Sequence, residues 1–197
     1  MLRSVVQVAD ATLEDVAGLV EIWGGGSGRP DRSSGTDPLA VGATSVARIA
    51  ADPDQRLLVA RVEGVVVGAA HLVCAQLSPV HSESVVHLLH LGVLEPYRGQ
   101  GVSTALVEAT VTWAEEKDVS HVRGAVTASS RDANRFMTRL GLAQVAVLRG
   151  ATTAALRARL PVEAPAVART DRRSHRNVGT VLAKRRSLRR AEQTRPV

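Results

Sequence analysis

The segment Leu88–Ser103 decides how the chain is organised, and it reads Leu-Leu-His-Leu-Gly-Val-Leu-Glu-Pro-Tyr-Arg-Gly-Gln-Gly-Val-Ser. It predicts a strand, a tight turn and the start of a helix. Gly99 and Gly101 allow the backbone to bend where a Cβ atom would clash. A helix is expected next because apolar residues recur with a period of 3.6. These residues are Val102, Ala105, Leu106, Ala109 and Trp113.

The predicted turn is suited to binding a phosphate. The first N–H groups of a helix have no acceptor within the helix, and the positive end of the helix dipole lies there as well. Arg98 adds a positive charge beside the turn. A charge-assisted hydrogen bond of this kind contributes about 1.5–3 kcal/mol.

A second segment predicts a helix further along the chain. Ser129-x-x-Asp132 has the spacing of a capping box, and Gly141 is typical of a helix C-terminus. Between them the chain carries Ala133-x-x-Phe136-Met137-x-x-Leu140, which places its apolar residues on one face.

These two segments together resemble the GNAT-type N-acetyltransferases. Arg98-x-x-Gly101-x-Ser103 is similar to the family's pyrophosphate loop, Gln/Arg-x-x-Gly-x-Gly/Ala, with Ser103 as the departure. The segment 133–142 is similar to the family's second signature, Ala-x-x-Phe-Tyr-x-x-x-Gly-Phe. The resemblance covers about residues 3–160. It implies an α/β fold in which a mixed, mostly antiparallel twisted sheet is flanked by helices and splayed at the fourth and fifth strands.

The remaining elements are predicted from local patterns. Thr12-x-x-Asp15 is a capping box, and Glu63-Gly64 is typical of a hairpin turn. We expect strands at 5–9, 56–62, 65–76, 84–94, 119–128, 142–148 and 154–160. We expect helices at 13–23, 38–51, 101–117 and 129–140, and a connecting loop at 24–38.

The resemblance also implies a co-substrate, acetyl-CoA, and the residues that bind it. The thioester would lie along strand 84–94, with its arm bonded to the backbone of Val93 and Leu94 as an added strand would be. An amide near Val93 would stabilise the oxyanion that forms during acyl transfer. The other expected cofactor-binding residues are Arg98, Gly99, Gln100, Gly101, Val102, Ser103, Ser129 and Asn134. Ser129 has the alternative role of capping its helix, and no metal site is expected.

An amine acceptor must lose a proton before it attacks. A lysine-like amine with a pKa of about 10.4 is almost entirely protonated at pH 7, so a general base contributes about 10²–10⁴ in rate. Family members with a carboxylate base carry it about six residues before the position of Val93, which is His87 here. Strand alternation predicts His87 on one face with Leu89, Leu91 and Val93, and His90 on the other. The candidate catalytic residues are His87, His90 and Glu83, and ordinary packing of both histidines is the alternative.

The proton for the departing thiolate has no evident donor. The tyrosine that often supplies it in the family is replaced here by Met137. Tyr97, the only tyrosine, lies in the Pro-Tyr-Arg turn, where we expect a structural role. Solvent or another residue would then protonate the thiolate.

Composition separates a folded body from a basic tail. Residues 161–197 contain ten Lys and Arg against three Asp and Glu, a net charge of +7, whereas residues 1–160 hold 15 and 16, a net charge of −1. We expect an acetyltransferase domain at 1–160 and a Pro/Ala-linked tail at 161–197, either disordered or a short amphipathic helix. The tail is suited to an anionic partner, or to folding back on the body.

Cys74 is the only cysteine, so no intramolecular disulfide forms, and no apolar run is long enough to cross a membrane. We therefore expect a cytoplasmic protein. The sequence leaves open whether the acceptor amine belongs to a small molecule or a protein, and whether the chain forms a homodimer.

Three functions follow from these patterns. The first is transfer of an acetyl group from acetyl-CoA to a primary amine by direct attack on the thioester. The second is a catalytically weak module that senses acyl-CoA, which Met137 favours. The third is a nucleic-acid-associated protein that acts through its basic tail.

Overall fold

The computed structural model describes residues 5–24 and 37–160. The predicted loop at 24–38 and the tail at 161–197 therefore lie almost wholly outside the described residues, and the predicted domain boundary at residue 160 stays a prediction. The chain divides into two compact units, Met1–Gln144 and Val145–Val197. The first unit holds the sheet and the helices around it, and the described part of the second, residues 145–160, holds one short helix.

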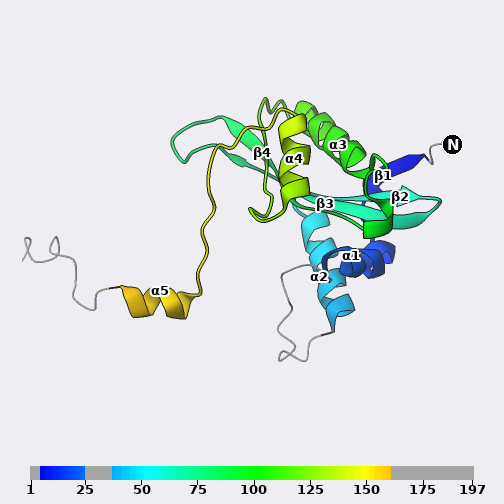
Figure 1. Cartoon of the computed structure of the whole chain (residues 1–197), viewed down its shortest axis with the longest axis horizontal. Coiled ribbons are helices and arrows are strands. Elements are labelled where there is room, and N and C mark those ends of the chain that lie inside the picture. The colour runs from blue at the N-terminus through cyan, green and yellow to red at the C-terminus, as the bar shows by residue number, and fades with distance from the viewer. Residues whose placement is uncertain (1–4, 25–36, 161–197) are drawn as a thin grey trace, which may run out of the picture. The chain divides into compact units, whose positions relative to one another are not determined.

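The first unit is built on a five-stranded mixed sheet (Figure 1). Its strands follow chain order: β1 (Val6–Asp10), β2 (Gln55–Val62), β3 (Val65–Gln76), β4 (Ser84–Val93) and β5 (Val122–Gly124). The first four strands pair antiparallel, and β5 pairs parallel to β4. The predicted α/β fold with a mixed, mostly antiparallel sheet is confirmed. The β2–β3 hairpin turns at Glu63 and Gly64, which have φ angles of 52° and 82°.

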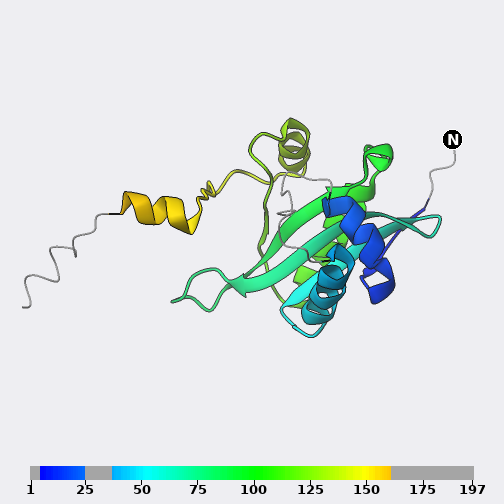
Figure 2. The same ribbon diagram turned by 90° about the horizontal axis from the view of Figure 1, so that it is seen from below.

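Helices cover both faces of the sheet. On one face, α3 (Val102–Glu116) and α4 (Arg131–Arg139) contribute Val102, Leu106, Trp113 and Met137 to the larger hydrophobic core. On the other face, α1 (Val16–Gly24) and α2 (Pro38–Ala50) pack Val16, Leu19, Val46 and Ile49 against the sheet. Figure 2 shows α1 and α2 lying across this second face. None of the helices in the described ranges has the length and apolar character that crossing a bilayer requires.

The first predicted capping box forms and is tied to the sheet. The Asp15 carboxylate, in the short helix η1 (Leu13–Asp15), accepts hydrogen bonds from the Thr12 amide at 2.8 Å and the Thr12 hydroxyl at 3.0 Å. Arg61 of β2 donates to the same carboxylate at 2.6 Å. Burial would raise the pKa of Asp15, but the hydrogen bonds from Thr12 and Arg61 outweigh it, so the pKa lies below its ordinary value.

A β-bulge in β4 corrects the predicted alternation. His71 pairs with Leu89, but Ala69 pairs with Gly92, so β4 carries one extra residue between the two pairs. His90 lies in this bulge with a φ angle of 49°. As a result Leu91 and Val93 pack on the larger core together with Leu88, and not on the face of His87. Alternation failed because it assumes an uninterrupted period of two.

The C-terminal part of the chain differs from the predicted strands. The strand predicted at 119–128 is only as long as β5. The strand predicted at 142–148 is absent, and residues 143–150 form neither strand nor helix. The strand predicted at 154–160 is helix α5 (Thr153–Arg159). Thr152 caps α5 by accepting from the Ala155 amide, and its Ala, Leu and Arg residues have high helix propensity. That propensity explains why a helix replaces the predicted strand.

The N-cap of α4 lies one residue after the serine that the sequence pattern predicts. Ser130, not Ser129, is the N-cap of α4, and its hydroxyl accepts from the Ala133 amide at 3.4 Å. The capping role considered for Ser129 is therefore wrong. The predicted C-terminal glycine is confirmed, since Gly141 has a φ angle of 85°.

Candidate acetyl-CoA site

The glycine turn has the geometry that its sequence predicts. Gly99 and Gly101 have φ angles of 75° and 89°, which side chains of L-residues rarely tolerate. Gly101 is the N-cap of α3, so the N–H groups of Val102, Ser103 and Thr104 have no acceptor within the helix. No atom lies within 4 Å of the place where a Cβ would stand on either glycine, so the turn is open on that side.

Two side chains hold this turn in shape. Gln100 Nε2 donates to the Pro96 carbonyl at 2.8 Å. Arg98 Nε approaches the Val93 carbonyl at 3.4 Å, and the rest of its exposed guanidinium is left without an ion pair among the described residues. The helix N-terminus, the open glycines and the arginine together fit a diphosphate.

The sheet parts where the predicted thioester arm would enter. Parallel pairing between β4 and β5 covers only Val86 to Leu88, and its last contact is the Ala125 amide to the Leu88 carbonyl at 3.0 Å. Beyond Leu88, β4 continues to Val93 without β5 beside it. The gap runs from Leu88 to the glycine turn, about 20 Å at the rise of an extended strand. We call the end at Leu88, where β4 and β5 still pair, the closed end, and the end at Val93 the open end.

The backbone donors at the open end of the gap are not equivalent. The Leu94 amide donates to the Val67 carbonyl at 2.9 Å, so it is already engaged within the sheet. The Val93 amide belongs to the edge that faces away from β3, because N–H directions alternate along a strand. Of the two predicted donors, Val93 alone is suited to an added arm.

Two glycines let helices approach the sheet closely at this level. A Cβ on Gly68 would stand 2.6 Å from Val102 Cγ1 of α3. A Cβ on Gly92 would stand 2.6 Å from Ile22 Cγ2 and 3.1 Å from Trp23 Nε1 of α1. The start of α3 and the end of α1 therefore pack closely at the open end of the gap, one on each face of the sheet.

His87 lies next to the closed end of the gap. It pairs with Val73 of β3 and with Arg123 of β5, one position before the last parallel pair. Its side chain is half-buried on the face that α1 and α2 cover, since Val73 shares the face of Ala69. Burial lowers the pKa of His87, and the charge of Arg123 lowers it further. His87 is therefore neutral at pH 7 and able to accept a proton.

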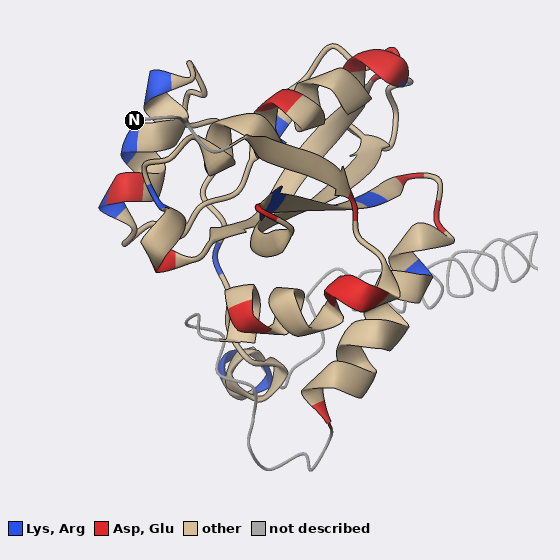
Figure 3. Ribbon diagram, turned by 90° about the vertical axis from the view of Figure 1, so that its right-hand side faces the viewer, with Lys and Arg blue, Asp and Glu red and all other residues tan. Residues whose placement is uncertain are grey.

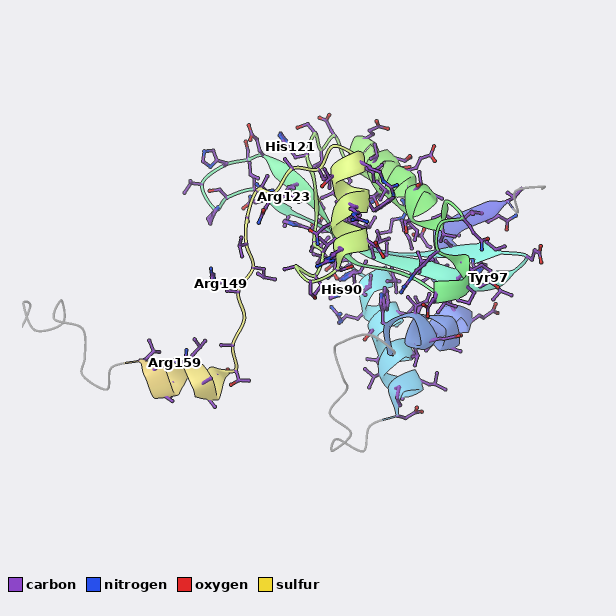
Figure 4. The ribbon with its side chains drawn as sticks, in the orientation of Figure 1. His90, Tyr97, His121, Arg123, Arg149 and Arg159 are labelled. Atoms are coloured by element: carbon purple, nitrogen blue, oxygen red, sulfur yellow. The ribbon has the colours of Figure 1, made fainter. Side chains whose placement is uncertain are left out.

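His90 lies on the same face as His87, which corrects the opposite faces predicted by alternation. Trp23 Nε1 donates to the His90 carbonyl at 2.8 Å, and the Trp23 and His90 rings meet edge to face with centroids 6.5 Å apart. The His90 ring is also parallel to that of His71, at 6.2 Å and 7°. Figure 4 shows His90 where the sheet meets α1 and α2, away from Arg123.

A chain of hydrogen bonds fixes the ring of His71. The Asp52 carboxylate can only accept, and Gln55 Nε2 donates to it at 2.7 Å. Gln55 Oε1 therefore faces His71 Nε2 at 3.0 Å, and that nitrogen must carry a hydrogen. Burial lowers the pKa of His71, and His90 and Arg48 lower it further. Sequence reasoning missed Trp23, Gln55 and His71 as site residues. The pairing of β2, β3 and β4 brings Gln55 and His71 to His90, and the packing of α1 on the sheet brings Trp23 there.

Glu83 is not brought to the other two candidates. It precedes β4, and its carbonyl closes the hairpin loop by accepting from the Leu77 amide at 2.8 Å. It lies seven residues from His90, about 23 Å along an extended strand. The structure therefore gathers two of the three predicted catalytic residues on one face and leaves Glu83 apart.

Of the predicted site residues around α4, some are engaged in contacts within the protein and others are available to a ligand. Asn134 Nδ2 donates to the Ser130 and Thr127 carbonyls at 2.7 and 3.2 Å, which holds the loop between β5 and α4. Ser129 is exposed and makes no such bond among the described residues. Met137 is buried in the larger core, and Tyr97 packs against that core from the short helix η2 (Glu95–Tyr97). Met137 carries no transferable proton, and the packing of Tyr97 fits the structural role predicted for it.

The first unit also has a surface hollow of about 340 Å³, and Asp52 and Gln55, which orient His71, are among the residues that line it. It is lined by β1, β2, α2 and Trp113, and includes Asp10 and Arg56. None of the predicted catalytic or cofactor-binding residues lines it, so the gap beside β4 remains the candidate site.

A sheet that opens beside a glycine turn and a helix N-terminus defines a class of acyltransferases that bind coenzyme A. The acetyltransferase (GNAT) family model matches residues 30–142, and the chain belongs to this family. It is an N-acetyltransferase that uses acetyl-CoA as co-substrate and an amine as acceptor. The predicted family, reaction and co-substrate are confirmed.

Solved structures share the fold at low sequence identity. A transcriptional regulator from Bacillus halodurans C-125 aligns with a TM-score of 0.67 at 19% identity, covering 75% of this chain and 99% of its own. The aminoglycoside N-acetyltransferase AAC(6')-Iy in complex with CoA gives 0.62 at 18%, covering 76% and 95%. A ribosomal-protein-alanine N-acetyltransferase from Brucella melitensis gives 0.58 at 20%, covering 75% and 99%. Comparison with curated protein sequences gives no match.

Proposed function

We propose that this protein acetylates a primary amine by direct attack on the thioester of acetyl-CoA, with the acyl group held at the closed end of the gap between β4 and β5. The observation that carries the proposal is the position of His87, one residue before the last β4–β5 pair and on the face covered by α1 and α2. The glycine turn stands at the other end of the same gap.

Acetyl-CoA would be bound by backbone more than by side chains. The free N–H groups from Gly99 to Ser103 would donate to the diphosphate, and Arg98 would add charge. The Val93 amide would bond the arm along the open edge of β4. Val102 contributes only its amide, because its side chain is 1% exposed in the core. Ser129 and the carbonyl oxygen of Asn134 are the side-chain groups left to contact the arm near α4.

His87 is the proposed general base. A half-buried imidazole with a lowered pKa is unprotonated at pH 7 and can take the proton from the attacking amine, directly or through water. Arg123, its cross-strand neighbour, would keep it unprotonated by repulsion.

His90 is the proposed partner for the acceptor. Its exposed ring lies at the bulge of β4, on the face of the sheet that α1 and α2 cover, which we call the acceptor face. There it would hold the amine or a water beside it. His71 is a positioning residue, since it acts through His90 and is itself oriented by Gln55 and Asp52.

The departing thiolate would be protonated by solvent. Met137 carries no transferable proton and is 6% exposed. This feature also supports a second candidate, a catalytically weak module that binds acyl-CoA and senses it.

One assay separates transfer from sensing. Free-thiol release from acetyl-CoA would be followed with a panel of small amines and amine-bearing peptides, alongside the melting temperature with and without acetyl-CoA. A stabilised protein that releases thiol with any amine supports the transferase. Stabilisation with no turnover on the whole panel supports the sensor, and a flat melting temperature contradicts both.

Two further points stay predictions. The single cysteine and the use of acetyl-CoA support a cytoplasmic location. Whether the chain forms a homodimer is the other, which the sedimentation of the full chain would test.

A further inference from the structure

Helix α4 carries a row of arginines that the acetyl-transfer reaction does not require. Arg131, Arg135 and Arg139 follow each other at intervals of four residues, about 6 Å apart along the helix axis, and all three are exposed. In Figure 3 basic residues recur along α4, at the left of the view. We call these three residues the arginine ridge.

The ridge is turned away from the protein core. Phe136 and Met137 of the same helix pack against the larger core, and helical geometry places them on the side opposite the ridge. Within residues 5–24 and 37–160, none of the three arginines forms an ion pair with a carboxylate. Like charges at this spacing destabilise a helix by about 0.2–0.5 kcal/mol per pair. Within α4 only Asp132 in the first turn and the place of Arg139 in the last turn offset that cost, and neither forms an ion pair among the described residues.

The ridge begins the basic part of the chain. Residues 131–197 contain 16 Arg and Lys against four Asp and Glu, a net charge of +12. Residues 1–130 contain nine against 15, a net charge of −6. The charge therefore changes sign at the start of α4 and not at the start of the tail.

The residue types indicate what kind of anion fits. Of the 16 basic residues, 15 are arginines and only Lys184 is a lysine. Arginine is the side chain best suited to bidentate contacts with phosphate. Phe136 is the only aromatic residue after position 130, and it packs on the core, so base stacking has no platform. This composition favours phosphate backbones over unstacked bases.

We propose that the arginine ridge binds the phosphate backbone of double-stranded nucleic acid, and that the basic segment after it strengthens this binding through its charge. The contacts would be independent of base sequence and strongly dependent on salt. This proposal does not depend on the acetyl-transfer roles assigned above.

The test measures binding of the full chain to a short fluorescent duplex by anisotropy over a range of KCl concentrations. The substitutions Arg131→Gln, Arg135→Gln and Arg139→Gln would be combined, since glutamine keeps helix propensity while removing charge. The slope of log affinity against log salt concentration changes by about 0.9 for each phosphate contact. Its magnitude should therefore be smaller by about 2.7 in the triple variant. DNA and RNA duplexes form separate arms that identify the preferred backbone.

A matched control comes from the opposite face of the sheet. Arg48→Gln on α2 removes the same charge as Arg135→Gln, and Arg48 is also exposed. We expect Arg135→Gln to reduce the slope by about 0.9 and Arg48→Gln to leave it unchanged. Thermal melting checks that each variant is folded, and the three single variants replace the triple variant if that one melts early.

Several results would overturn the proposal. These are an unchanged slope for the ridge variants, an equal effect of Arg48→Gln, or binding of polyglutamate as tight as that of the duplexes. The last result would assign the ridge to acidic polypeptides, including the acidic part of this chain.

Discussion

Trp23 and His90 are joined by a hydrogen bond from the indole nitrogen to the backbone carbonyl, 2.8 Å long, across 67 positions of sequence. The bond links the end of α1 to the bulge that turns β4 at the candidate site. It gives the bulge carbonyl a partner that the sheet no longer supplies, and it places the Trp23 ring beside His90, which is stacked on His71. Helix α1 therefore helps to set the geometry of the acceptor face.

The close approach of α1 to β4 depends on Gly92. Gly92→Ala would place a Cβ 2.6 Å from Ile22 Cγ2 and displace Trp23 from the His90 carbonyl. We expect a loss of about 1–3 kcal/mol in the free energy of unfolding, measured by urea denaturation. Gly150→Ala, where no atom lies within 4 Å of the added Cβ, is the control and should be neutral. Equal stabilities of the two variants would mean that α1 can move away from β4 at little cost in free energy.

Arg98 should matter for the coenzyme and not for folding. Arg98→Ala removes a charge beside the helix N-terminus, and we expect acetyl-CoA binding to weaken by at least tenfold, as measured by calorimetry. Arg98 is exposed, forms no ion pair among the described residues and makes one long hydrogen bond, 3.4 Å to the Val93 carbonyl, so the melting temperature without ligand should change little. Unchanged affinity would remove Arg98 from the diphosphate site.

His87 should control the acid side of the pH profile. Its pKa is lowered, so the base stays active below the ordinary histidine pKa and kcat/KM falls only when the pH drops through the lowered value. We expect His87→Gln to reduce kcat/KM by about 10²–10⁴ at pH 7 and to flatten this limb. Arg123→Gln should move the limb to higher pH, because a nearby positive charge is lost. A profile that keeps its shape in His87→Gln would exclude His87 as the base.

His71 should affect catalysis through His90. His71→Phe keeps a planar ring but breaks the bond to Gln55, and we expect KM for the amine to rise with little change in the affinity for acetyl-CoA. Gln55→Glu would keep an acceptor toward His71, so it should retain more activity than Gln55→Leu. If both Gln55 variants behave alike, the acceptor at position 55 does not orient His71.

Asp15 should make stability depend on pH. Its folded pKa is lowered, so its contribution is present above the unfolded value of about 3.9 and is lost as the pH falls through the folded value. Asp15→Asn should cost about 2 kcal/mol at pH 7, less than a fully buried pair because Arg61 is partly exposed. The difference from the original chain should shrink towards the lowest pH, and a constant difference would point to packing instead.

The strongest local signals in the sequence were confirmed where neighbouring residues alone set the geometry. Gly99, Gly101 and Gly141 adopt positive φ angles, the hairpin turns at Glu63 and Gly64, and α2 and α3 end within one residue of their predicted limits. The predictions that failed include local ones as well as the alternation along β4, which depends on pairing with β3. The strand predicted at 142–148 is absent, and the capping serine was displaced by one position.

The sequence by itself determined the family, the glycine turn and the identity of the co-substrate, because a helix N-terminus with positive-φ glycines is a local structure that short-range sterics impose. Only the tertiary structure decided the acceptor face. A single extra residue in β4 reverses the side on which every later side chain points, and pairing with β3 alone reveals it. That register brings His90 to His71, places His90 beside Trp23, and puts His87 on the same face at the closed end of the gap.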